Sequence, residues 1–105
     1  MTYGEIMAMM DETGLPFAYD HFAEGESPDP PFLVFLLPRS DNFNADNRVY
    51  QKIAELRVEL YTDRKQPDVE FLVEGILDGY DLNYEQEEIW IAEERLYENI
   101  YTMEM

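Results

Sequence analysis

The chain has 105 residues, 46% of them hydrophobic, and its 24 acidic and seven basic residues give a formal net charge of −17. This length corresponds to one domain, residues 1–105, with a modest core, and the many apolar and aromatic residues exclude a disordered acidic tail. The lack of cysteine excludes disulfides and thiolate metal sites, and the scarcity of Lys and Arg argues against specific nucleic-acid binding.

The first predicted element is a helix over Thr2 to Thr13. Thr2 and Glu5 have the spacing of a capping box, in which each side chain accepts a hydrogen bond from a free backbone N–H of the first turn. Gly14 supplies a stop at the carboxyl end. No basic segment followed by an apolar core precedes this helix, so we expect no signal peptide.

A short strand over Phe17 to Phe22 and a Pro- and Gly-containing loop over Ala23 to Pro31 follow. Phe32 to Leu37 is an unbroken apolar run of the length of one strand, which is typical of a central strand buried on both faces. It is the longest apolar run and far shorter than the roughly 20 residues of a membrane span. We therefore expect no membrane contact.

The polar residues from Ser40 to Asn47 predict a loop. From Ala54 to Tyr61, apolar and charged residues then alternate, which indicates a strand with one apolar and one charged face.

Pro67 to Gly79 is the clearest predicted helix, because Pro67 suits its first position and acidic residues follow at its positive end. A core-facing stripe at helical spacing comprises Val69, Leu72, Val73, Ile76, Leu77 and Tyr80. Glu74 and Asp78 are expected to point away from this stripe.

Asp81 to Ile91 and Arg95 to Met103 are predicted as two final strands with a turn near Ala92 to Glu94. One long strand from Ile89 onward is the alternative, because the turn lacks Gly, Asn and Pro. The expected fold is α+β: a mainly antiparallel sheet of about five strands with two helices packed on it, in the order α-β-β-β-α-β-β.

Catalytic chemistry finds little support in the sequence. The only histidine, His21, follows Asp20 in the predicted first strand, where neighbouring side chains point to opposite faces, so Asp20 is not expected to orient its ring. Close carboxylate pairs such as Glu87 and Glu88 are expected by chance among so many acids and are interpreted as solvated faces. We predict no catalytic residues, no cofactor and no enzymatic activity.

Asn42, Asn44 and Asp46 have the spacing of the first ligands of a calcium loop, but Asn47 and Ile53 stand where that loop requires Gly and Glu. A side-chain-capped turn is the simpler interpretation, and no metal site is predicted.

Aromatic residues are numerous for so small a core, which indicates an oligomer or partner surface. The residues concerned are Tyr50, Tyr61, Tyr84, Trp90, Tyr97 and Tyr101.

Three stretches of the sequence resemble motifs of one protein family. They are Pro30 to Phe35 (PPFLVF), Asn42 to Tyr50 (NFNADNRVY) and Val58 to Lys65 (VELYTDRK). Together with Asp68 to Leu77 and the closing Glu93 to Tyr101 segment, they resemble the tail terminator proteins of tailed phages and prophages, also called tail completion or head–tail joining proteins.

The resemblance implies a structural, non-enzymatic virion protein that is made in the host cytoplasm. In that family, subunits assemble as a ring, typically hexameric, on the head-proximal end of the tail tube. The ring ends tail polymerisation and contacts the major tail tube protein and the head completion or connector protein. A carboxylate-lined lumen that repels passing DNA would be consistent with the charge.

For a subunit or partner contact, the resemblance and the mixture of turn, aromatic and basic residues point to one segment. Its residues are Asn42, Phe43, Asn44, Asp46, Asn47, Arg48, Tyr50 and Lys52. The alternative function is an acidic DNA mimic that inhibits a host nuclease or restriction system. A mimic would array its carboxylates regularly at about phosphate spacing, whereas here the acids are spread over every segment.

Overall fold

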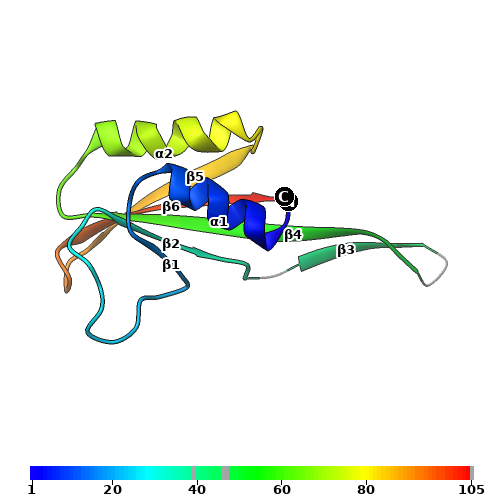
Figure 1. The fold of residues 1–105 in the computed structure, drawn as a ribbon, viewed down its shortest axis with the longest axis horizontal. Helices are drawn as coiled ribbons and strands as arrows, with labels where there is room; N and C mark the ends of the chain where they lie inside the picture. Colours follow the sequence, from blue (N-terminus) through cyan, green and yellow to red (C-terminus); the bar gives the residue numbers. More distant parts are fainter. Residues whose placement is uncertain (39, 46–47, 105) are drawn as a thin grey trace.

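The protein is an α+β domain in which two helices lie on one face of a sheet (Figure 1). This computed structural model describes residues 1–38, 40–45 and 48–104, with side chains for residues 1–38 and 55–104. The helices are α1 (Tyr3–Glu12) and α2 (Pro67–Gly79). The strands are β1 (Phe17–Tyr19), β2 (Phe32–Leu36), β3 (Ser40–Ala45), β4 (Arg48–Thr62), β5 (Tyr84–Ile91) and β6 (Leu96–Glu104).

The sheet is ordered β1-β2-β4-β6-β5, and β3 pairs with β4 outside this path. Only the β1–β2 pair is parallel. The fold class, the two helices and the five predicted strands in their predicted order are therefore confirmed. β3 is an additional strand where a loop was predicted. Its residues are poor strand formers, so the pairing with β4, and not local propensity, accounts for it.

Local sequence signals set both ends of α1. The predicted capping box is present: Glu5 N–H donates to Thr2 Oγ1 at 3.1 Å, and Thr2 N–H donates to Glu5 Oε1 at 3.1 Å. Gly14, two residues after the last helical residue, has φ of 71°, a conformation that glycine adopts without strain.

The bounds of α2 agree with the prediction, and Pro67 lies at its start. Its buried face is rotated relative to the predicted stripe. Leu72 is 45% exposed, and Val73 and Leu77 are buried. Successive helix residues are about 100° apart, so a face centred on Val73 and Leu77 leaves Leu72 outside. The prediction for Leu72 was therefore wrong.

Polar contacts hold the side of α2 that carries Glu70 and Glu74 against the sheet. Glu70 is buried, and Glu74 accepts a hydrogen bond from the Tyr101 hydroxyl at 2.8 Å. The prediction that Glu74 points away from the core was wrong, because the buried phenol on β6 requires an acceptor.

The sheet has two different faces. Cross-strand pairs place Leu33 opposite Leu60 and Val58 opposite Tyr101 on the face that the helices cover. The buried core on this face comprises Ile6, Met9, Met10, Leu33, Phe35, Leu56, Val58, Leu60, Val73, Leu77, Tyr101 and Met103. The alternate residues of the same strands, such as Phe32 and Glu59, lie on the opposite face, which we call the open face. The β1–β2 loop contacts the open face through an edge-on packing of Phe22 on Phe32.

Several strand boundaries differ from those predicted, most of all those of β1, β4 and β5, which begins at Tyr84 and not at Asp81. β1 ends at Tyr19, because Asp20 has φ of 64° and leaves the extended conformation. β4 begins at Arg48, six residues before the predicted strand, because β3 pairs with this part. The predicted final hairpin is confirmed, with a turn over residues 92–95 in which Arg95 has φ of 56°. The alternative of one long final strand is therefore wrong.

Candidate functional site

The predicted contact residues lie largely on one hairpin. β3 pairs with residues 48–54 of β4, and the register places Asn42 opposite Lys52, Phe43 opposite Gln51 and Ala45 opposite Arg48. The register shifts between Phe43 and Asn44 and leaves Tyr50 without a facing residue, as in a β-bulge. We call β3 and residues 48–54 of β4 the arm.

Six of the eight predicted contact residues belong to the arm, and Asp46 and Asn47 lie outside the described residues. The prediction of a loop for residues 40–45 is corrected to a strand. Asn42 and Asn44 therefore belong to a paired strand and not to a ligand loop. Among the described residues, no group of three or more His, Cys, Asp or Glu side chains is placed to hold a metal ion.

The arm extends along the longest axis of the molecule, away from the two helices (Figure 1). The overall extents are 50 × 29 × 23 Å. β6 pairs with β4 only over Glu55 to Thr62, so beyond Glu55 the sheet continues as the two strands of the arm. A two-stranded ribbon is marginally stable on its own in water. The arm therefore has backbone edges with which to engage a partner.

The charge of the sequence is distributed unevenly between the arm and the rest. Residues 39–54 contain three of the seven basic residues, Arg39, Arg48 and Lys52, and two of the 24 acidic residues. The remainder therefore holds four basic and 22 acidic residues. The formal net charge is therefore +1 for residues 39–54 and −18 for the remainder, which we call the body. This difference in charge favours encounter between the arm of one molecule and the body of another.

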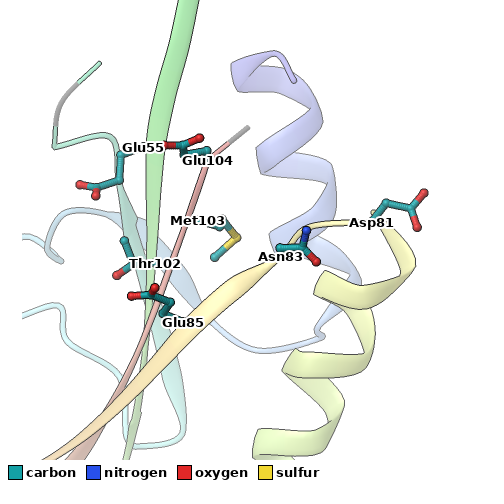
Figure 2. Close-up of a pocket in the computed structure, with 7 residues that line it drawn as sticks. All are labelled: Glu55, Asp81, Asn83, Glu85, Thr102, Met103 and Glu104. Carbon is teal, nitrogen blue, oxygen red and sulfur yellow. The ribbon is translucent and has the colours of Figure 1, made fainter. Parts of the chain in front are cut away.

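A cavity of about 460 Å³ lies at the arm-proximal end of the sheet (Figure 2). Its lining residues are Glu55, Asp81, Asn83, Glu85, Thr102, Met103 and Glu104. Figure 2 shows Asp81 pointing away from the other three carboxylates. The four carboxylates do not point toward one common position at which a cation could bind. We therefore assign no ligand to this cavity.

A second cavity of about 320 Å³ lies on the open face. Its apolar wall includes Phe32, whose ring stacks on that of Tyr61 with centroids 5.1 Å apart. Its rim includes Asp20, His21 and Ser27.

His21 Nδ1 lies 2.8 Å from Asp20 Oδ2. The prediction that Asp20 does not orient this ring was wrong, because the left-handed backbone of Asp20 ends the strand and turns both side chains to one side. The histidine side chain is 78% exposed, and within the described part of the chain its side chain bonds only to Asp20. A triad requires the base to contact a nucleophile, so this pair does not form one.

A buried polar cluster, which we call the Glu59–Glu98 cluster, occupies the open face beside this cavity. The Tyr61 hydroxyl lies 2.9 Å from Glu59 Oε1 and 2.8 Å from Glu98 Oε2. Arg57 Nε lies 2.8 Å from Glu59 Oε2. Both glutamates are less than 10% exposed. Burial and the two hydrogen-bonded carboxyl groups raise the pKa of Tyr61.

A second cluster links α2 to β5. Lys65 Nζ lies 2.8 Å from Glu70 Oε1 and 2.7 Å from Glu88 Oε1. These two hydrogen bonds raise the pKa of Lys65. The lysine keeps buried Glu70 from being an unpaired charge.

Alternation along Ala54 to Tyr61 predicted that Glu59 lies on a charged face, and neither this pattern nor the many acids gave a reason to expect that Glu59 and Glu98 are buried. The order of residues along the chain does not reveal that Glu98 on β6 lies opposite Tyr61 on the neighbouring strand β4. Of the six aromatic residues that indicated an oligomer or partner surface, Tyr50 lies outside the described side chains, and the other five differ in burial. Tyr101 is fully buried, Tyr61, Tyr84 and Tyr97 are half-buried, and Trp90 is 47% exposed.

Comparison with models of known protein families and with curated proteins gives no match for this chain. Neither helix of the described residues is long and apolar enough to cross a membrane.

Proposed function

We propose that this protein is a structural virion protein of a tailed phage or prophage. Copies of it form a ring, typically hexameric in the family that the sequence resembles, at the head-proximal end of the tail tube. The ring ends tail polymerisation and presents the head–tail joining surface. Its partners are further copies of itself, the major tail tube protein and the head completion or connector protein.

The observation that carries this proposal is the arm. It coincides with the segment from Asn42 to Lys52 that the resemblance and the residue types select as a contact surface. A two-stranded extension is marginally stable by itself and gains stability when a second molecule packs against it. A subunit that offers such an arm on one side and a different surface on the other makes heterologous contacts, and these form a ring when the rotation closes.

The charge distribution supports contact between the arm and a body. The body repels other bodies, and the arm is the part of the sequence that does not share the excess of acids. Carboxylates on a ring lumen would also keep DNA from adhering during its passage. Synthesis in the host cytoplasm followed by incorporation into the virion is part of the same proposal.

The DNA-mimic alternative receives less support. On β5, Glu85 and Glu87 lie on the open face, whereas Glu88 lies on the helix side and pairs with Lys65. The acids of this strand are thus divided between two faces and do not form one phosphate-like row.

The decisive experiment is deletion of the gene from an inducible prophage. A tube end is a repeating surface that recruits subunits until something occupies it, so the deletion is expected to leave intact heads and tails of uncontrolled length that do not join. Complementation with the wild-type gene should restore normal tails. Tails of normal length and a normal titre in the deletion strain would refute the proposal, and inhibition of a host nuclease by the purified protein would favour the mimic instead.

A further inference from the structure

The Glu59–Glu98 cluster has more acceptor oxygens than hydrogens to satisfy them. The Tyr61 hydroxyl has one hydrogen, yet its oxygen lies within 2.9 Å of a carboxyl oxygen of both Glu59 and Glu98. An O–H group donates once and accepts through its lone pairs. With both carboxyl groups ionised, one of these short contacts joins two oxygens with no hydrogen between them, which is costly at a buried position.

Arg57 decides which carboxyl group stays ionised. Its Nε lies 2.8 Å from the second oxygen of Glu59, and a guanidinium at this distance favours the carboxylate form. Among the described side chains, no cation forms an ion pair with Glu98. Burial raises the pKa of Glu98, and the neighbouring Glu59 raises it further, while Tyr61 and Arg57 act in the opposite direction.

The surroundings of Glu98 on the open face favour a neutral group. Its direct cross-strand neighbours are Tyr61 on β4 and Ile89 on β5. β2 presents Phe32, Val34 and Leu36 to this face and contributes no titratable group. The other titratable or charged groups that the strands and loops bring to this face are Glu55, Arg57, Glu85, Glu87, Glu104, Asp20, His21 and Glu94. Acids predominate among them, so the field on this face favours proton uptake.

We propose that Glu59, Tyr61 and Glu98 hold two protons in the folded protein, one on the phenol and one shared by the two carboxyl groups and carried mainly by Glu98. The cluster is then a proton-binding site built into the β4–β6 pairing. With Arg57 it has no net charge while the shared proton is bound. Loss of the proton leaves two adjacent buried carboxylates and one donor between them.

The sign of the linkage follows from the direction of the shift. The unfolded chain releases this proton near the ordinary glutamate value of 4.5, and the folded protein releases it at higher pH. The stabilisation is therefore fully present below pH 4.5 and is lost as the pH rises through the folded-state pKa of Glu98. This inference does not depend on the proposed function, because it concerns the stability of each subunit.

The test is a carbon-13 NMR titration of the glutamate side-chain carboxyl groups in the full-length protein, assigned by through-bond experiments. Glu98 is expected to titrate with a midpoint above the ordinary glutamate value of 4.5. The control is Glu85→Gln, which removes an exposed acid of the same face at a position that faces Thr102 and not Glu98. In this control, the midpoint of the Glu98 titration should still lie above 4.5. A Glu98 midpoint at or below the ordinary value would overturn the proposal.

Thermal unfolding between pH 4 and 8 gives the second readout. Glu98→Gln replaces the shared proton with a permanent amide donor of nearly the same shape. In the wild type, this cluster should make the melting temperature fall as the pH rises. We expect this contribution to be absent in Glu98→Gln and present in Glu85→Gln. An unchanged pH slope in Glu98→Gln counts against the proposal, and if this variant does not fold, the wild-type titration alone decides.

Discussion

Tyr101 and Glu74 join the centre of the sheet to α2. The phenol of Tyr101, which has no exposed surface, donates a hydrogen bond of 2.8 Å to Glu74 Oε2. This bond fixes the rotation of α2 over β6, and the same rotation removes Leu72 from the core.

We expect Tyr101→Phe to lower the free energy of unfolding by about 1–3 kcal/mol, because a hydrogen bond to a charged acceptor is lost. Glu74→Gln is the matched control, since the amide oxygen still accepts and the loss should be smaller. Burial and Glu74 raise the pKa of Tyr101 above the ordinary 10.0. The contribution is therefore complete below pH 10 and lost only above that value. Denaturant titration at pH 7 measures the difference, and equal stability of wild type and Tyr101→Phe would contradict it.

Leu77→Ala and Leu72→Ala test the orientation of α2 as a pair. Leu77 is fully buried and Leu72 is 45% exposed. Truncation of Leu77 should cost about 2–5 kcal/mol, and truncation of Leu72 should cost less than about 1 kcal/mol. The comparison uses the denaturant midpoints of the two variants under one condition. A loss of about 2–5 kcal/mol in both variants would show that α2 is rotated as the sequence pattern predicted, with Leu72 and Leu77 both in the core.

Lys65→Met should destabilise the protein by leaving Glu70 buried without its cation. Removal of one partner of a fully buried pair costs about 3–5 kcal/mol. The Lys65 side chain is 50% exposed, so solvent screening reduces the expected loss to about 1–2 kcal/mol. The double variant Lys65→Met, Glu70→Gln should recover part of this loss, because no buried charge remains. A double variant less stable than Lys65→Met would mean that Glu70 does not depend on Lys65.

Charge reversal on the arm tests the contact surface separately from the fold. Arg48→Glu and Lys52→Glu should weaken ring formation or binding to tail tubes, because they remove positive charges that would attract the acidic body of a neighbouring molecule. Arg64→Glu is the control, since Arg64 is exposed and lies outside the arm. Light scattering and negative-stain microscopy report assembly, and circular dichroism confirms that the variants are folded. Normal assembly of both arm variants would refute this choice of contact surface. The proposed function would still be tested by the gene deletion.

The sequence was sufficient where a local signal determines the structure. The capping box of Thr2 and Glu5, Pro67 at the start of α2 and the alternation around Val58 each depend on neighbours within a few residues. It was insufficient where partners come from distant segments. β3 forms because β4 is opposite it, and Glu59 and Glu98 are buried together because β4 pairs with β6. The contact segment was predictable as a segment, but its strand conformation was not.

β4 belongs to both the core and the arm, and this has a mechanical consequence. Its 15 residues correspond to an unbroken strand of about 50 Å at roughly 3.3 Å per residue. Leu56, Val58 and Leu60 anchor one end of this strand in the core, so a one-residue slip would turn all three toward the open face. Force applied to the arm is therefore transmitted along a central strand of the sheet, which pairs with β2 on one side and with β6 on the other. A partner that engages the arm therefore acts directly on the strand that carries three core residues of the subunit.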